Sequence, residues 1–147
     1  MAEEKDDRRI SSITELIYLF FCGAIIYMSI EIAYRGYTHW SMGIVGGLCF
    51  LIIGGLNNYI DKDMPVIKQG IIGGVVVTLL ELIAGLILNI WLKLNIWDYS
   101  AVPLNLWGQI CLPFSCLWCG LSIVAVYVDD FIRWIVFKET FPKHKWW

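Results

Sequence analysis

The sequence predicts an all-α integral membrane protein, a bundle of four transmembrane helices arranged as two antiparallel hairpins. The 147 residues are 59% hydrophobic and 16% charged, whereas soluble domains carry about 25% charged residues. The mean hydropathy is +0.67, and the charged residues are segregated from long apolar runs. This composition leaves little chain for a soluble catalytic domain and indicates membrane lipids, not nucleic acid, as the surroundings.

Four apolar runs are each close to the roughly 20 residues that a helix needs to cross a bilayer. Because the connections between these runs are short, consecutive helices are expected to be antiparallel neighbours. The predicted spans are Ile13–Tyr34, Met42–Ile60, Val66–Leu92 and Leu104–Val128.

Several residues mark the ends of the predicted helices. Ser12, followed three residues later by Glu15, predicts a capping box that opens the first helix. Asp63 and Pro65 predict the start of the third helix. Pro113 falls inside the fourth predicted span, where it is expected to kink the helix.

The distribution of lysine and arginine predicts the orientation. These residues are concentrated at both termini and around the connection at residues 61–65. The connections at residues 35–41 and 93–103 contain only Arg35 and Lys93. The positive-inside rule therefore places both termini in the cytoplasm and predicts a multi-pass protein of the plasma (cytoplasmic) membrane.

The chain is expected to form one transmembrane domain over residues 1–128, with a short cytoplasmic N-terminus. An amphipathic, basic tail follows over residues 129–147. The tail begins with mixed apolar and charged residues that suit an interfacial helix. It ends with lysines and tryptophans that suit a headgroup surface, among which His144 is expected to be solvated.

Glu81 is the most informative single residue, because it lies near the middle of the third apolar run. A charged residue at the centre of a membrane helix costs roughly 2.5–3.5 kcal/mol on insertion scales, and such residues usually face a bundle interior or a wet cavity. Thr78 and Asn89 share its helix face at three- or four-residue steps, together with several glycines. This spacing predicts a polar pocket inside the bundle.

The other candidate binding or transport residues lie toward the predicted outer face, so the pocket is expected to open outward. Glu31 and Arg35 are spaced to form an ion pair on one helix, which would be a purely structural role. His39 is a lone histidine without a second metal ligand beside it, so no metal site is assigned. The full candidate set is Glu81, Glu31, Arg35, His39, Trp40, Asn89, Trp97, Asp98, Tyr99, Asn105 and Gln109.

Three motifs stand out in the sequence, and they are Glu31-x-x-x-Arg35-Gly-x-Thr-His39-Trp40-Ser41-Met42, Thr78-Leu-Leu-Glu81-Leu-Ile-Ala-Gly85 and Trp97-Asp98-Tyr99-Ser100. Together with Pro103, Asn105 and Gly108, they resemble a known family over the chain from Glu31 to about Trp118. The family is the bacterial one labelled putative ABC-transporter type IV, or CmpB-like, with similar animal transmembrane proteins. The resemblance implies a small multi-span membrane protein that acts as a transporter permease subunit.

The residues leave several functions open. The first is binding or transport of a small solute or ion at Glu81, with the protein acting as a homo-oligomer or with a partner membrane subunit. The second is an accessory subunit of a membrane complex. No G-x-x-x-x-G-K-[ST] phosphate loop is present, so coupling to ATP would need another chain.

The third function is a membrane enzyme acting on a lipid-linked substrate, with Glu81, Glu31 and Asp98 as acid and base. Cys116 and Cys119 also form a C-x-x-C pair that a thiol oxidoreductase could use. No nucleophile elbow, paired metal ligands or cofactor motif accompanies these residues, so no catalytic residue and no cofactor is assigned.

Overall fold

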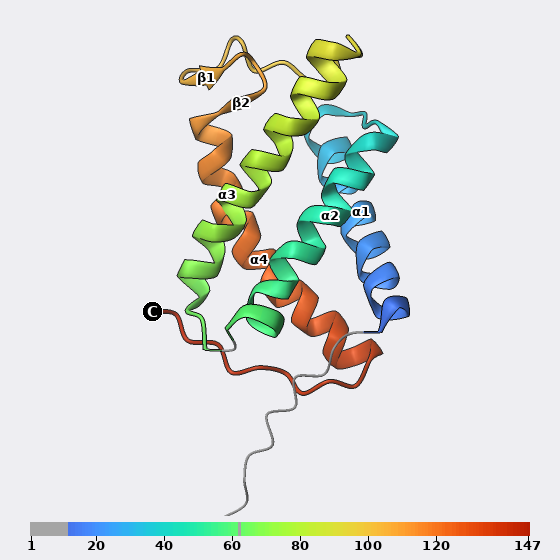
Figure 1. Cartoon of the computed structure of the whole chain (residues 1–147), viewed down its shortest axis with the longest axis vertical. Coiled ribbons are helices and arrows are strands. Elements are labelled where there is room, and N and C mark those ends of the chain that lie inside the picture. Colours follow the sequence, from blue (N-terminus) through green and yellow to red (C-terminus); the bar gives the residue numbers. More distant parts are fainter. Residues whose placement is uncertain (1–11, 62) are drawn as a thin grey trace, which may run out of the picture.

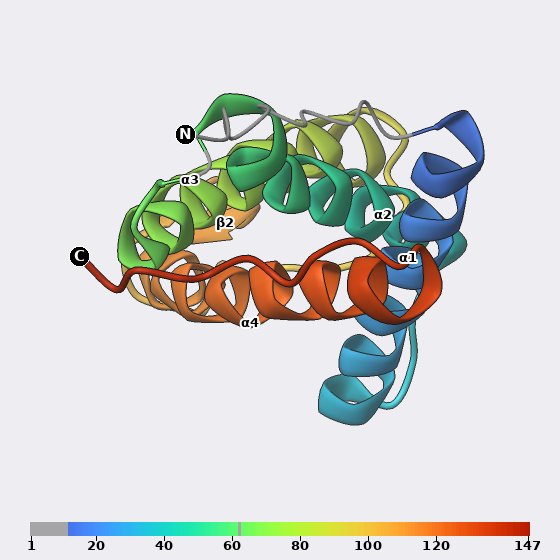
Figure 2. The same cartoon turned by 90° about the horizontal axis from the view of Figure 1, so that it is seen from below.

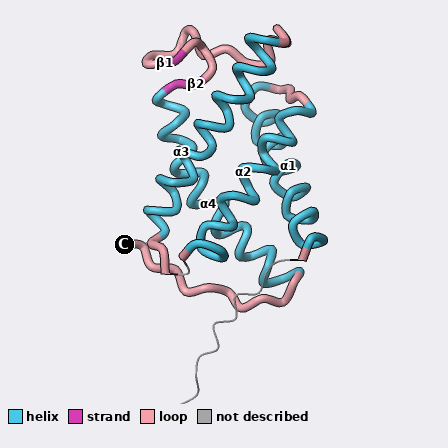
Figure 3. The backbone as a smooth tube through the Cα atoms, in the orientation of Figure 1, coloured by secondary structure: helices cyan, strands magenta, loops and turns pink. Residues whose placement is uncertain are grey.

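The computed structural model describes residues 12–61 and 63–147, and most of this part of the chain is helical (Figures 1 and 3). It contains four helices long and apolar enough to cross a membrane, as expected for a helical membrane bundle. Two of them are extended by short π-helical segments. The elements are α1 (Ile13–Arg35), α2 (Trp40–Gly55), η1 (Leu56–Ile60), α3 (Val66–Gly85), η2 (Leu86–Trp91), β1 (Asn105–Leu106), β2 (Ile110–Cys111) and α4 (Leu112–Val136).

The first helix starts and ends where its sequence signals indicate. The Ser12 hydroxyl accepts a hydrogen bond from the Glu15 backbone N–H at 3.3 Å, and the Glu15 carboxylate accepts one from the Ser12 N–H at 3.1 Å. These two bonds confirm the predicted capping box. Gly36 ends α1 in the left-handed conformation, with φ of 80°, which glycine adopts without steric cost. The N-terminal segment Met1–Ile10, which is expected to be cytoplasmic, lies outside the described residues.

The predicted start of the fourth span is wrong, because α4 begins at Leu112. The apolar residues before it form a turn in which β1 pairs antiparallel with β2. The Asn105 side chain donates to the Val102 carbonyl at 2.9 Å and accepts from the Gly108 N–H at 3.0 Å. These bonds stabilise a compact turn in place of a helix. Pro113 lies in the first turn of α4, where a missing N–H breaks no helical bond, and the predicted kink is therefore wrong.

The helices pack in pairs around α2. Helix α1 lies against α2, α3 lies against α4, and α2 also contacts both α3 and α4. Figure 2 shows this arrangement from below, with α2 between α1 and α3. The closest approaches occur at glycines, where backbones can come near one another. Phe50 covers Gly23, for example, and Tyr27 covers Gly46.

Gly74 is expected to be essential for the contact between α3 and α4. A Cβ atom at this position would lie 2.8 Å from the backbone nitrogen of Cys119 and 2.9 Å from its Cα, so Gly74→Ala must push two helices apart. We expect a loss of about 1–3 kcal/mol of stability, measured as a lower midpoint of thermal unfolding in detergent. Gly120→Ala is the matched control, because a Cβ there meets no atom within 4 Å. Equal midpoints for the two variants would contradict this packing.

The C-terminal tail lies across the end of the bundle where α3 begins (Figure 1). The Lys145 carbonyl accepts a hydrogen bond from the Val66 N–H at 2.8 Å, and the Trp146 carbonyl accepts one from the Ile67 N–H at 3.4 Å. The first N–H groups of a helix have no partner within that helix. The tail supplies two of these partners for α3.

A buried polar cluster lies beneath the tail, where the sequence suggested a surface helix. Residues 129–136 are the last turns of α4, and Asp129, Asp130 and Arg133 are all buried. Arg133 donates from Nε to Asp129 at 2.7 Å, and Asn57 donates to Asp130 at 3.1 Å. His144 Nε2 lies 3.0 Å from an Asp130 oxygen, and its side chain is 8% exposed. The prediction of a solvated His144 is therefore wrong, because the tail folds back onto α4.

Candidate functional site

The Glu81 carboxylate lies inside the bundle, with the residue only 2% exposed. One carboxylate oxygen accepts a hydrogen bond from the Tyr99 hydroxyl at 2.8 Å, and the other accepts one from the Trp118 indole N–H at 3.0 Å. Helix α3 supplies the carboxylate, α4 supplies Trp118, and the connection between the two helices supplies Tyr99. Neither of these partners carries a positive charge.

Tyr99 is a fixed donor to Glu81. Burial raises the pKa of its hydroxyl, and the neighbouring Glu81 carboxylate raises the pKa further. The hydroxyl therefore stays protonated at physiological pH and donates to the carboxylate. The ring is held by stacking on Phe114 of α4, with centroids 4.9 Å apart.

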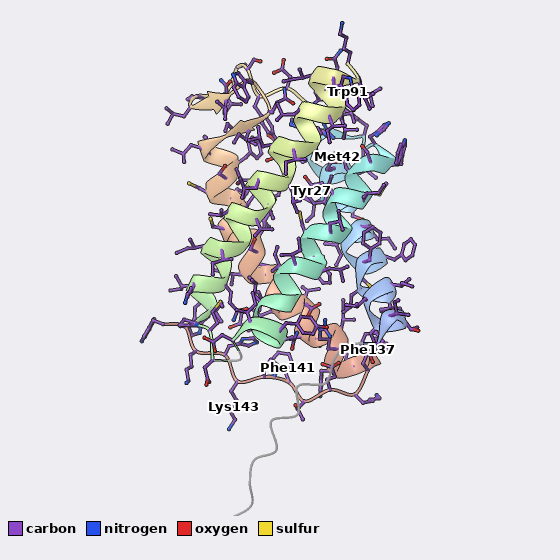
Figure 4. The ribbon with its side chains drawn as sticks, in the orientation of Figure 1. Tyr27, Met42, Trp91, Phe137, Phe141 and Lys143 are labelled. Carbon is purple, nitrogen blue, oxygen red and sulfur yellow. The ribbon has the colours of Figure 1, made fainter. Side chains whose placement is uncertain are left out.

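A cavity of about 140 Å³ lies next to Glu81. All four helices and the connection between α3 and α4 contribute to its wall. Tyr27 and Met42, two of its lining residues, lie in the half of the bundle toward the α1–α2 connection (Figure 4). The lining consists of the charged residues Glu31, Arg35 and Glu81, the aromatic residues Tyr27, Tyr34, Trp97, Tyr99, Phe114 and Trp118, and the aliphatic residues Ile30, Met42, Leu117 and Leu121.

Glu31 and Arg35 form an ion pair at the edge of this cavity. Arg35 donates to Glu31 at 2.7 Å and to the Ile96 carbonyl at 2.6 Å. The second Glu31 oxygen accepts from the Thr38 hydroxyl. The ion pair predicted from the four-residue spacing is thus confirmed. With both carboxylates ionised, the charged side chains lining the cavity carry a net charge of −1, and Glu81 is the one without a cationic partner.

Asn89 and Gln109 build the wall behind the cavity. Asn89 donates to the Trp97 carbonyl at 3.0 Å and to the Gln109 side chain at 2.9 Å, and it accepts from the Ile96 N–H at 2.7 Å. The Trp97 indole donates to the Gln109 carbonyl at 3.0 Å. The nitrogen and the oxygen of the Asn89 amide are therefore both hydrogen-bonded, and these bonds hold Ile96, Trp97 and Gln109 against the end of α3.

Replacing Asn89 by leucine is expected to loosen this wall. The change leaves three buried polar groups without their partner, and each such group costs about 1–3 kcal/mol. We expect a clear fall in the thermal midpoint of the purified protein. Asn58→Leu is the control, because Asn58 donates to the Gly54 carbonyl one turn earlier in the chain and does not join one connection to another. A midpoint for Asn89→Leu no lower than that of the control would contradict the bracing role.

Six of the eleven predicted site residues do not line the cavity. Two of them, Asn89 and Gln109, lie behind its wall, and the other four lie in or beside the connections between helices. His39 caps α2 by accepting from the Ser41 N–H at 3.4 Å, and Trp40 is 68% exposed. Asp98 is exposed and accepts from the hydroxyl and the N–H of Ser100, which lower its pKa. Asn105 is exposed in the turn before α4. These residues lie at the end of the bundle that carries the α1–α2 connection (Figure 1).

Comparison with known proteins gives one clear result. The model of the family described as "Putative ABC-transporter type IV" matches residues 18–147. The chain belongs to this family. The matched region includes every residue of the Glu81 cavity, and family membership together with the four apolar helices fits a membrane transporter-like protein. No curated protein and no solved structure matches the chain.

Two important residues of this site carry little signal in the sequence. Trp118 donates directly to Glu81, and it lies between Cys116 and Cys119, both of which are free thiols. Phe114 was not singled out. The spacing of Phe114 and Trp118, one helical turn apart, could have indicated a shared aromatic face on α4.

Proposed function

We propose that this protein binds a small cation in the Glu81 cavity and carries it across the membrane. One observation supports the proposal most strongly. A carboxylate that is 2% exposed faces a cavity of about 140 Å³, and within the described part of the chain its hydrogen-bond donors are the neutral side chains of Tyr99 and Trp118. Removing a carboxylate from water without a cationic partner is costly. A bound cation would supply the missing charge.

Access to this cavity is proposed from the end of the bundle that carries the α1–α2 connection. By the positive-inside rule this is proposed to be the outer end, with the helices within each hairpin antiparallel and both termini cytoplasmic. Several lining residues are also exposed at the surface, among them Ile30 at 43%, Tyr34 at 75% and Leu117 at 50%. They come from α1 and α4, which supports an entrance between these two helices in the outer half of the plasma membrane.

The predicted site residues take different parts in this proposal. Glu81 binds the cation, and Glu31, Arg35, Trp97 and Tyr99 line the space around it. Asn89 and Gln109 hold the wall. His39, Trp40, Asp98 and Asn105 form the outer rim, through which the cation approaches.

Movement of the cation across the membrane is proposed to need a second protein chain in contact with the bundle. Between Glu81 and the buried polar cluster beneath the tail lies an apolar layer, in which Cys49, Ile53, Val77 and Val126 pack together. A charged solute cannot pass such a core without a rearrangement. We propose that the bundle rearranges against a second copy of the chain or against a partner membrane subunit, and that this rearrangement lets the cation pass.

Flux through proteoliposomes tests the proposed function. Wild-type protein should release a preloaded panel of labelled inorganic and organic cations faster than empty liposomes do, and Glu81→Gln should reduce the rate to background. Asp63→Asn is the control, because this carboxylate is exposed near the opposite end of the bundle. Equal flux through wild type and Glu81→Gln would remove Glu81 from the mechanism.

A further inference from the structure

Aromatic rings form the largest single group in the wall of the cavity beside Glu81, six of its thirteen lining residues. Tyr99 stacks on Phe114 with centroids 4.9 Å apart, and Tyr27 stacks on Trp118 with centroids 5.9 Å apart. Trp97 and Tyr34 complete the set. Aromatic walls of this kind attract alkylated ammonium ions, which keep a positive charge but have a weakly hydrated, apolar surface. Small inorganic cations prefer several oxygen ligands instead.

The size of the cavity limits the group that it can hold. Its volume of about 140 Å³ is close to the roughly 150 Å³ of a protein cavity known to accept benzene. A trimethylammonium group fits such a space, whereas a large polycyclic dye does not. The net charge of −1 on the lining favours a single positive charge.

A second cavity adjoins the first and extends toward the tail end of the bundle. It has a volume of about 110 Å³ and shares Tyr27, Ile30, Trp118 and Leu121 with the cavity at Glu81. Its remaining lining is almost entirely apolar. Val124, on its wall, is 55% exposed on the outer surface of α4. The space between α1 and α4 is therefore charged and aromatic at one end and apolar at the other.

We propose that the ligand is a quaternary ammonium compound that carries an apolar chain. The ammonium head lies among the aromatic rings beside Glu81, and the chain lies in the adjoining cavity between α1 and α4. This inference rests on the proposed function and adds the class of the cation. An amphipathic cation of this kind can approach sideways from the bilayer as well as from the aqueous face.

The preference for the ammonium head is tested first, by calorimetry on protein in lipid nanodiscs. The probes are choline and dimethylbutanol, its neutral carbon isostere, with potassium as the inorganic competitor. Choline should bind at least about tenfold more tightly than the isostere, since a desolvated cation is attracted to the faces of aromatic rings, and potassium should compete poorly. Equal binding of the two isosteres would overturn the proposal, and so would potassium displacing choline at equal concentration.

The role of the rings is tested with Phe114→Leu, which removes aromatic surface without removing a hydrogen bond to Glu81. Choline binding should weaken by about three- to thirtyfold. Phe131→Leu is the matched control, since Phe131 is 51% exposed elsewhere on α4 and should leave binding unchanged. Equal affinities in the two variants would overturn the aromatic assignment.

The chain site is tested by comparing tetramethylammonium with hexyltrimethylammonium. Ala125→Phe places a ring in the adjoining cavity, and Val128→Phe does so from another position of the same wall. Either variant that elutes as folded protein should bind the hexyl compound about tenfold more weakly and tetramethylammonium as the wild type does. Equal effects on both compounds, or no effect on either, would overturn the chain assignment.

The outcomes separate this inference from the proposed function. If potassium or another inorganic cation binds in a Glu81-dependent way while no ammonium compound binds, the inference is wrong and the proposed function stands. If no cation binds in a Glu81-dependent way, both are wrong.

Discussion

Replacing Glu81 by glutamine is expected to weaken cation binding on the order of a hundredfold. The carboxylate is the one charged group of the cavity lining without an oppositely charged partner, and a unit charge at contact distance is worth a few kcal/mol in partly buried surroundings. Glutamine keeps the size of the side chain, and its oxygen can still accept from the Trp118 indole. Its amide can donate to the Tyr99 hydroxyl, so the local fold should persist.

The measurement is equilibrium dialysis of a labelled cation against wild-type and variant protein in nanodiscs. Tyr99→Phe gives an informative comparison, because it removes one hydrogen bond to the carboxylate but leaves the charge in place. Its effect should be much smaller, within about tenfold. If Glu81→Gln binds as tightly as Tyr99→Phe, the charge of Glu81 does not hold the ligand.

Replacing Asp129 by alanine is expected to have the largest effect on stability, about 3–5 kcal/mol, which is typical when a buried ion pair loses one partner. Asp129 is fully buried and Arg133 is 3% exposed, and their side chains meet at 2.7 Å. Glu139 lies farther from the guanidinium, at 3.7 Å. The variant therefore removes a buried carboxylate that is in direct contact with the guanidinium.

This loss is measured as the denaturant midpoint of the detergent-solubilised protein. Asp61→Ala is the control, because Asp61 is exposed in the short connection before α3. The double variant Asp129→Leu with Arg133→Met should recover at least half of the lost stability, since apolar residues of similar volume often replace a buried ion pair without a penalty. A change in Asp129→Ala no larger than that of the control would show that this pair does not hold the tail end together.

The sequence was sufficient to find the four membrane helices, because each needs only length and hydropathy. It was insufficient for the start of α4. Residues 104–111 are apolar enough to continue a helix, but Leu104 and Trp107 adopt positive φ of 55° and 52°, and the Asn105 side chain closes the turn. Hydropathy carries no information on such backbone geometry, and the turn residues Asn105 and Gly108 were its only local signal.

The residues of the candidate site were also only partly predictable from the sequence. Glu81 was found from sequence because a carboxylate in an apolar run is costly and rare. Trp118 could not be recognised as its partner, since an aromatic residue in a membrane helix usually serves only as packing. Asp129, Asp130 and Arg133 lie at the end of a span, where charge is ordinary. Their burial depends on the tail folding back over α4, a long-range contact that no local pattern specifies.

The central claim is that the cavity beside Glu81 binds a cation, and its most direct test is an anomalous difference map. Crystals of the wild-type protein would be grown with a bromine-labelled choline analogue. The account predicts a bromine peak between α1, α3 and α4, in the space bordered by Glu81, Tyr27 and Trp118, and no such peak in crystals of Glu81→Gln. A wild-type map with this space empty, or an equal peak in both proteins, would contradict the account.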